Sequence, residues 1–481
     1  MPEKSLKLNF FYNILLQMSK VIFPLITAPY VARVLEPDGV GLVNFASTYA
    51  GYFALFAALG IPMYGIREVA KHRGGIQTQT QFVSEVMSLS IVMTIICTLL
   101  FLGSLVVIPQ LNENYVIFVI SGLVLYLTPF RIDWFYQGNE EFGYITFRSL
   151  VIKIISILCL FIFVHEKSDL LIYVILGAVC SVINEVWNFV KLWNFGIHPY
   201  FTIHFKQHVK PLTLLFSSSI AISIYTILDT LMLGFMSDYS EVGYYNSATH
   251  ISKAILPIAT SLCMVVMPRL SYYTKDENWA MINSLMKTSL SVVSFLCFPL
   301  TCALVAIAPT FVPLFYGEQF SGTIVPLQVV SGVITVIGLN NLFGVQILVG
   351  LGKDKLFLYA VLVGTFSNFI LNLALIPIIG ATGAALASVT AEALILAVEI
   401  WQVKKYTKVN LSGFKEIFIC LILSIAFFPI IAGLNLLVDG WLLIALFTIV
   451  GSLFYLITQY ICKNTAMMSF VEVFMKKTHN K

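Results

Sequence analysis

The chain has 481 residues, of which 59% are apolar and only 11% are charged, and its formal net charge is +4. A soluble protein carries about 25% charged residues, so this composition excludes a soluble enzyme, and its hydrophobicity excludes a disordered chain. The small positive charge gives no reason to expect a nucleic-acid partner. Long apolar runs separated by short polar segments instead predict an all-α integral membrane protein.

Apolar runs long enough to cross a bilayer as helices, about 20 residues each, recur along the whole chain. Pro24 and Pro29 fall inside the first of them and predict a bent helix. The polar segments between the runs are too short to form a separate soluble domain. We predict fourteen transmembrane helices, over residues 10–34, 40–63, 82–108, 115–136, 144–164, 170–192, 211–236, 241–267, 287–308, 322–349, 356–376, 381–403, 415–436 and 440–461.

Basic residues are distributed unequally between the two sides of these spans. If the N-terminus is cytoplasmic, the inner segments contain 23 of the 28 Lys and Arg residues, and the outer loops contain only Lys167. The other four, Lys20, Arg33, Lys153 and Lys253, fall within spans. Because cytoplasmic loops of membrane proteins are enriched in Lys and Arg, this asymmetry supports the predicted spans and places both termini in the cytoplasm.

A weak internal repeat appears when the chain is shifted by 202 residues. The shift aligns the second span with the eighth, in the pairs Val40–Val242, Gly41–Gly243, Asn44–Asn246, Ala46–Ala248 and Arg67–Arg269. Six spans separate the copies, so we predict two pseudo-symmetric six-helix lobes and two extra C-terminal helices. The lobes are residues 1–205 and 206–410, and residues 411–481 hold helices 13 and 14 and a cytoplasmic tail. Paired lobes are common in transporters, with the substrate path between them.

Charged side chains within spans are candidate functional groups, because each costs about 2.5–3.5 kcal/mol at mid-helix. Lys20, Arg33, Lys153 and Lys253 are candidates for binding an anionic headgroup, and internal ion pairs or surface salt bridges are the alternative. Asp133 is expected to neutralise a basic residue elsewhere, such as Lys153 on the next helix.

Two further groups, Asp229 and His250, belong to the predicted second lobe. Asp229 is expected either to pair with Lys253 or to carry a proton or sodium ion for coupling. His250 lies three residues before Lys253, so the two share a helix face, and His250 is a further candidate for an ion pair or for coupling. Glutamates late in their spans are expected to be interfacial; these are Glu185, Glu392 and Glu399.

Nothing in the sequence predicts a metal or a cofactor. The eight cysteines lie in or at the edges of apolar runs without metal-ligand spacing, so we expect them to be small core residues. Gly350, Gly352 and Lys353 lack the first glycine and the Ser/Thr of a Walker motif, which argues against ATP binding. Trp134 is expected in the aromatic belt at the membrane interface, with stacking on sugar rings as the alternative.

Three stretches resemble the polysaccharide transporter (Wzx-type flippase) family of the multidrug/oligosaccharidyl-lipid/polysaccharide exporter superfamily. They are residues 29–41 (PYVARVLEPDGVG), Gln137-Gly138 with Glu140, and residues 368–387 (NFILNLALIPIIGATGAALA). The first ends the first span, the second follows the fourth span, and the third joins the eleventh span to the twelfth. The similarity extends along essentially the whole chain.

The resemblance implies a fourteen-helix flippase rather than an enzyme. Such a protein moves undecaprenyl-diphosphate-linked oligosaccharide repeat units across the bacterial plasma membrane by alternating access, for the synthesis of a capsule or O-antigen-like polysaccharide. Lys20, Arg33, Lys153 and Lys253 are then the candidates for holding the diphosphate. Membrane lipids, H⁺ or Na⁺ as a coupling ion and a polysaccharide polymerase are the other candidate partners.

Three alternative functions remain open. A lipid II flippase shares the fold, and a MATE-like drug/cation antiporter would favour acidic over basic groups in its cavity. A membrane polysaccharide polymerase or ligase would need a sizeable outer loop with catalytic groups, whereas the predicted outer loops here are short.

Overall fold

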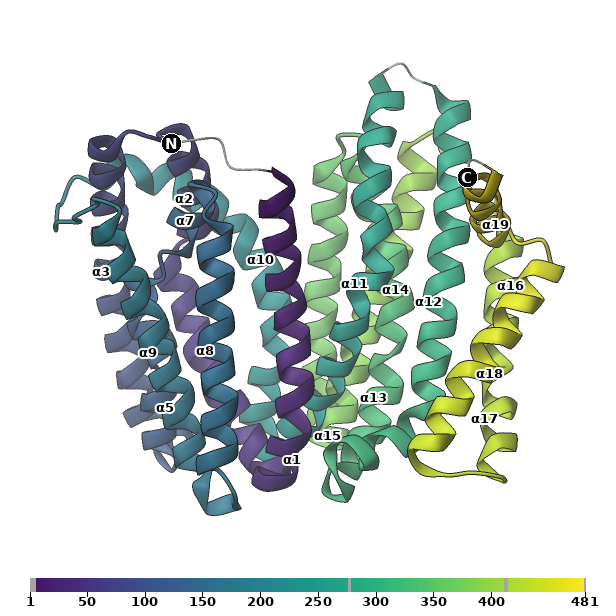
Figure 1. The fold of residues 1–481 in the computed structure, drawn as a ribbon, viewed down its shortest axis with the longest axis horizontal. Helices are drawn as coiled ribbons and strands as arrows, with labels where there is room; N and C mark the ends of the chain where they lie inside the picture. Colours follow the sequence, from purple (N-terminus) through teal and green to yellow (C-terminus); the bar gives the residue numbers. More distant parts are fainter. Residues whose placement is uncertain (1–5, 276–277, 411–413, 480–481) are drawn as a thin grey trace. The chain divides into compact units, whose positions relative to one another are not determined.

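The computed structural model describes residues 6–275, 278–410 and 414–479, which are almost entirely helical (Figure 1). The chain divides into two compact units, residues 1–243 and 244–481. Within the described ranges, ten helices are long and apolar enough to cross a membrane. The prediction of an all-helical membrane protein is therefore confirmed.

Two of the long helices each contain two predicted spans joined at a kink. In α1 (Leu6–Ala58) the helical dihedral angles are interrupted at Glu36 (φ 59°, ψ 174°), directly before Pro37, rather than at the two earlier prolines. In α15 (Asp354–Tyr406) they are interrupted at Ile379 and Gly380. Gly380 has φ 50°, a left-handed conformation that glycine adopts at little cost. Both kinks fall where the sequence predicts a break between two spans.

The first unit is built from α1 and a series of helices that follow it. The second predicted span ends early, because Leu59 and Gly60 both adopt positive φ and turn the chain into a separate amphipathic helix, α2. The fourth predicted span, 115–136, is assembled from short pieces around Pro129, which has no backbone N–H to donate. The remaining elements are α2 (Ile61–Lys71), α3 (Ile76–Val107), α4 (Pro109–Asn112), α5 (Tyr115–Ser121), α6 (Leu123–Tyr126), η1 (Thr128–Phe130), α7 (Asp133–Gly138), α8 (Phe142–Phe163), η2 (Lys167–Asp169), α9 (Leu170–Asn194), α10 (Lys206–Met236) and the start of α11 (Tyr239–Lys275).

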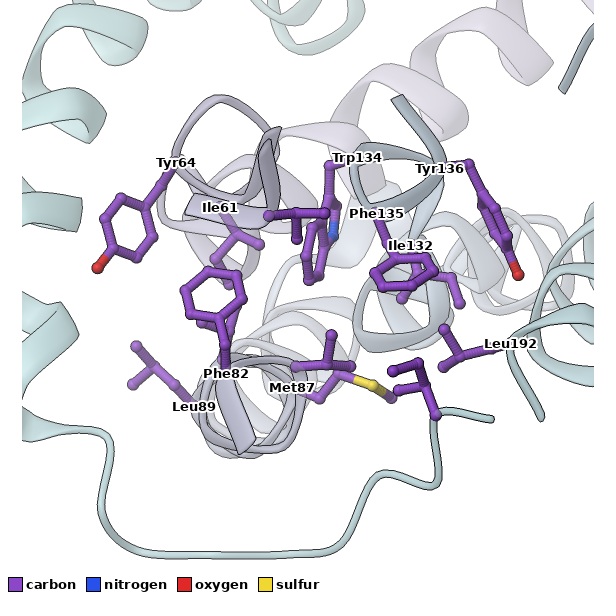
Figure 2. Packing of buried hydrophobic residues seen from close by; sticks show 14 of the residues in the cluster. Ile61, Tyr64, Phe82, Met87, Leu89, Ile132, Trp134, Phe135, Tyr136 and Leu192 are labelled. Atoms are coloured by element: carbon purple, nitrogen blue, oxygen red, sulfur yellow. The ribbon is translucent and has the colours of Figure 1, made fainter. Parts of the chain in front are cut away.

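An aromatic core joins α2, α3 and α7 near the predicted cytoplasmic side of the first unit (Figure 2). Trp134 is buried in this core, and a Cβ atom on Gly65 would lie 2.3 Å from its ring. Trp134 is therefore a packing residue in the core, and its prediction as an interface-belt residue is wrong.

The helix α10 packs against α1 within the first unit. Near its end, a Cβ atom on Gly234 would lie 2.1 Å from the Phe45 ring, and Gln110 Nε2 donates a hydrogen bond to the Gly234 carbonyl at 2.7 Å. The division between the two compact units consequently falls after α10. The lobe boundary at residue 205, which comes from the internal repeat, stays a prediction.

The second unit contains the rest of α11 and the C-terminal helices. The helices α16, α17 and α18 pack on α12 through a cluster that includes Phe295, Phe427, Phe447 and Tyr455. One segment is a π-helix, η4, a conformation that is often found at functional sites. The elements of the second unit after α11 are α12 (Trp279–Tyr316), η3 (Glu318–Thr323), α13 (Ile324–Val330), α14 (Gly332–Asn340), η4 (Asn341–Val349), α15, α16 (Phe414–Ile425), α17 (Phe427–Asn435), α18 (Gly440–Ile461) and α19 (Thr465–His479).

The cysteines differ in exposure more than the sequence predicts. Cys97, Cys297, Cys302 and Cys420 are buried, in keeping with core residues, whereas Cys462 is exposed. The side chains of Cys263 and of Arg269, one member of the internal repeat, lie outside the described residues.

Candidate functional site

Two of the four predicted substrate-binding residues lie close together in the first unit. Lys20 is on the first half of α1 and Lys153 is on α8, and these two helices pack against each other. Lys153 Nζ contacts Ser19, the residue directly before Lys20 on α1. Lys153 is half-buried, while Lys20 is exposed on the surface of the chain.

The surroundings of this lysine pair hold Lys153 in place without neutralising it. Lys153 Nζ donates a hydrogen bond to Ser19 Oγ at 2.9 Å and lies 5.3 Å from the centre of the Phe23 ring. The Ser19 hydroxyl in turn donates to the Leu16 carbonyl at 2.7 Å. Over the described part of the chain, neither lysine has a carboxylate within ion-pair distance. Two like charges in adjacent apolar helices, with no carboxylate partner, favour an anionic ligand.

Arg33 lies at a different level of the same helix. It is 13 residues from Lys20, which corresponds to roughly 20 Å along a helix axis. It is exposed and close in sequence to Glu36, whose carboxylate pairs with Lys167 Nζ at 2.7 Å. The structure therefore does not bring Arg33 into the lysine pair.

Asp133 has a different partner from the one predicted. Its Oδ1 accepts hydrogen bonds from Arg148 Nη2 at 2.8 Å and from Asn188 Nδ2 at 2.9 Å, whereas Lys153 donates to Ser19. Arg148 is only 1% exposed, and the Asp133 side chain is 42% exposed. The prediction that Asp133 neutralises a basic residue is therefore confirmed, but that residue is Arg148 on α8 and not Lys153.

The same network extends to Glu185 on α9. Asn188 Nδ2 also donates to Glu185 Oε2 at 3.2 Å, and Arg131 Nε lies 4.0 Å from Glu185 Oε1. Glu185 is buried within the protein, and its predicted position near the membrane interface stays a prediction. Its carboxylate and that of Asp133 bind Arg131 and Arg148 and fix the short helix α7 between α8 and α9.

Arg131 also lines a cavity of about 300 Å³ inside the first unit. The cavity wall is mostly apolar, but Ser90, Thr128 and Trp134 contribute to it together with the Arg131 guanidinium. A cavity with one cation, two hydroxyls and one indole ring can accept an anionic or sugar-like group.

A second cavity of about 310 Å³ in the same unit has a different lining. Among the described residues that line it, the phenol of Tyr173 is the only ionisable group, and the polar side chains are hydroxyls. The hydroxyl residues on its wall are Thr27, Ser47, Ser121, Ser156, Tyr173 and Ser181.

A buried polar chain that the sequence analysis missed connects α10 to α2 and α3. His208 Nε2 lies 2.7 Å from Glu85 Oε2, and His208 Nδ1 lies 2.8 Å from the Tyr64 hydroxyl. Burial raises the pKa of the Tyr64 phenol, so Tyr64 stays protonated and can donate to Nδ1. His208 Nε2–H then donates to Glu85. The hint in the sequence was a histidine between two basic residues at the start of an apolar run.

On the adjacent exposed face of α2, Glu68 is held by two cations. Its Oε1 lies 3.0 Å from Lys71 Nζ and 3.1 Å from Arg67 Nε. Partial burial opposes ionisation of the carboxyl, but the hydrogen bonds from Lys71 and Arg67 outweigh it and lower the pKa of Glu68.

The other predicted residues are divided between the two units. Asp229 is buried in α10 in the first unit, whereas His250 and Lys253 are exposed on the part of α11 that belongs to the second. The pairing of Asp229 with Lys253 therefore stays a prediction. A search of the described residues finds no group of three or more His, Cys, Asp or Glu side chains arranged to hold a metal ion.

Comparison with known proteins identifies a family model, "Polysaccharide biosynthesis protein", that matches residues 6–274. The chain is 26% identical over 416 residues to a protein of Escherichia coli strain K12 named "Putative O-antigen transporter", covering 83% of this chain and 97% of that protein. It is 22% identical over 430 residues to the "Probable low-salt glycan biosynthesis flippase Agl15" of Haloferax volcanii, covering 85% and 88% of the two chains.

Solved structures show the same fold. "Lipid II flippase MurJ, inward closed conformation" superposes with a TM-score of 0.74 at 17% identity, covering 94% of this chain and 98% of that one. An inward-facing multidrug resistance MATE family transporter of the MOP superfamily superposes with a TM-score of 0.58 at 13% identity, covering 82% and 97%. At these identities the likeness establishes the fold and not the substrate.

Proposed function

Because the chain belongs to the polysaccharide biosynthesis protein family of membrane transporters, we propose that it is a flippase for undecaprenyl-diphosphate-linked oligosaccharide repeat units. It moves them across the bacterial plasma membrane by alternating access, for the synthesis of a capsule or O-antigen-like polysaccharide. The family consists of transporters and not enzymes, so the chain's role is to carry a glycan intermediate rather than to polymerise it.

The observation that supports this substrate most strongly is the pair of ammonium groups formed by Lys20 and Lys153. A lipid diphosphate carries negative charge at the junction between its hydrophobic tail and its hydrophilic glycan. Two lysines on apolar helices can bind this group, since lysine ammonium groups are well suited to phosphate. The same lysines would repel a cationic drug, which argues against an antiporter of cationic compounds.

The first unit also offers surfaces for the glycan. The cavity at Arg131 and Trp134 and the hydroxyl-lined cavity at Ser121 and Ser156 are polar enough to meet sugar hydroxyls within a mostly apolar wall. In this proposal the lipid tail stays in the bilayer, and Arg33 and Lys253 contact the headgroup at other stages of its passage.

We further propose fourteen transmembrane helices with both termini in the cytoplasm. The kinks of α1 and α15 each separate two spans, and α10 and α11 cover the seventh and eighth predicted spans. The unequal distribution of Lys and Arg supports this orientation. We also propose that H⁺ or Na⁺ acts as the coupling ion for transport and that a polysaccharide polymerase is a partner protein.

Deletion of the gene, followed by analysis of lipid-linked glycans, tests the function. We expect repeat units to accumulate on the cytoplasmic leaflet and the surface polysaccharide to disappear. Expression of the Lys20→Ala variant in the deletion strain should give a protein that inserts normally into the membrane but does not restore transport. Surface polysaccharide that persists in a deletion strain without a redundant transporter would show that the assignment is wrong.

A further inference from the structure

A carboxyl group that the proposed function does not use lies fully buried in the second unit. Glu399, on the second half of α15, is 0% exposed. Neither of its carboxylate oxygens has a hydrogen-bond partner among the described residues. It was predicted to be interfacial because it lies late in its span. This face of α15 packs against α13, α14 and η4, and the depth of Glu399 in the membrane stays a prediction.

The backbone of the π-helix closes directly over this carboxyl group. A Cβ atom added to Gly344 of η4 would lie 2.2 Å from Glu399 Oε1, and the Phe357 ring lies against the same place. A glycine is therefore required at position 344 for the approach of η4 to Glu399. Gln346, two residues later, is also fully buried, and neither its amide nitrogen nor its amide oxygen has a hydrogen-bond partner in the described structure.

A second buried carboxyl group lies two helical turns away on the same face of α15. Glu392 accepts hydrogen bonds from Asn340 Nδ2 at its Oε2 (2.5 Å) and at its backbone carbonyl (3.2 Å). Asn340 is itself 8% exposed, and its amide oxygen has no hydrogen-bond partner in the described part of the chain. An unpartnered buried acceptor thus lies beside Glu392.

The charges around Glu399 give no reason for it to ionise. Glu392 is the group whose charge acts on it, and that charge is of the same sign. Of the elements packed against α15, α13, α14 and η4 contain no ionisable residue, and α11, whose Tyr245 hydroxyl lies 3.2 Å from Ser388 Oγ, carries His250 and Lys253 at exposed positions. Lys404 and Lys405, further along α15, are exposed, as are Asp354 and Lys355 at its start. An isolated carboxylate in such a place is strongly disfavoured.

We propose that Glu399, with Glu392 and Asn340 beside it, is a proton-binding site inside the second unit. Glu399 holds the proton while η4 covers it. When the contact with Gly344 opens and water enters, the O–H bond of the carboxyl group breaks and the proton passes to water. The inference goes beyond the proposed function and does not depend on it, because it concerns only the occupancy of a buried carboxyl group.

Infrared spectroscopy of the purified full-length protein tests the proposal directly. The C=O stretch of a protonated carboxyl group is resolved from that of a carboxylate, so we expect one such band to persist at neutral pH and to be absent from Glu399→Gln. Glu318→Gln, at an exposed position of the same unit, is the matched control and should retain the band. Identical neutral-pH spectra for the parent and Glu399→Gln would overturn the proposal.

Two further measurements keep the test decisive even if Glu399→Gln folds poorly. Glu392→Gln removes the neighbouring negative charge and should move the loss of the band to a different pH, whereas an unchanged titration would count against a shared site. Replacement of choline by Na⁺ at constant pH should leave the band intact. Loss of the band on addition of Na⁺ would mean that the site holds a metal cation and would overturn proton binding.

Discussion

Gly41 provides the sharpest test of packing in the first unit. It lies five residues after the kink of α1 and packs against the start of α11, where a Cβ atom would lie 1.7 Å from the Tyr239 carbonyl oxygen and 2.9 Å from the Gly243 backbone nitrogen. In the reverse direction, a Cβ atom on Gly243 would lie 2.4 Å from the Pro37 carbonyl oxygen. The internal repeat relates Gly41 to Gly243 and Pro37 to Tyr239, so the two glycines form a symmetric crossing.

The size of the effect of Gly41→Ala follows from this geometry. Backbone atoms cannot rotate away, so the two helices must separate by roughly 1.6 Å to restore a carbon–oxygen contact of about 3.3 Å. Overpacking of this kind costs about 1–3 kcal/mol. Alanine in place of glycine also favours the helix by about 1 kcal/mol. Gly51→Ala on the same helix has no atom within 4 Å of its new Cβ and gains helix propensity without the clash, so it is the matched control.

Thermal unfolding of the two purified variants in detergent measures the difference. We expect Gly51→Ala to unfold at or above the temperature of the parent protein and Gly41→Ala to unfold clearly below Gly51→Ala. Because both variants share the gain in helix propensity, the difference between their unfolding temperatures measures the effect of the steric clash where α1 contacts α11. Equal unfolding temperatures would refute the close contact between α1 and α11.

Three further predictions concern buried polar groups and orientation. His208→Ala removes a partner from both Glu85 and Tyr64 and should cost about 1–3 kcal/mol of unfolding free energy, whereas His204→Ala, at an exposed position, should unfold like the parent. In a double-mutant cycle, Arg148→Met and Asp133→Asn should each destabilise the protein, but their combined effect should be smaller than the sum; strict additivity would contradict the ion pair. A membrane-impermeant maleimide should label Cys462 in inside-out vesicles and not in intact cells, with Cys462→Ser as the blank, and labelling of intact cells would reverse the proposed orientation.

The positions of the long apolar helices could be predicted because the thickness of a bilayer fixes the length of an apolar helix. The kinks at Glu36 and Gly380 fall between predicted spans for the same reason. The pieces of the fourth span could not be foreseen, since Pro129 shows that the helix is interrupted but not how the chain continues.

The interaction partners of the charged residues were harder to predict from the sequence than the positions of the helices. Arg148 and Lys153 are five residues apart on α8, so about 140° of helical rotation separates them, and they face different neighbours. Asp133 lies against one of these faces and Ser19 against the other. Which helix covers which face depends on tertiary packing, and for that reason the sequence suggested Lys153 as the partner of Asp133.

The buried glutamates show the same limit. The positions of Glu185 and Glu399 late in their spans did not reveal that each lies on a helix face that is covered by protein. His208 was missed because a histidine in a basic segment is usually a solvated residue, and nothing in the sequence shows that Glu85 and Tyr64 lie opposite it.

The account depends above all on an anion bound by Lys20 and Lys153. Binding of undecaprenyl diphosphate to the purified protein, measured by native mass spectrometry for the parent, Lys20→Ala and Lys153→Ala, tests it most directly. A hydrogen bond to a charged group contributes about 1.5–3 kcal/mol, so each variant should bind about ten- to a hundredfold more weakly. The uncharged alcohol undecaprenol should bind all three proteins equally. Undiminished binding of the diphosphate to both variants would contradict the account.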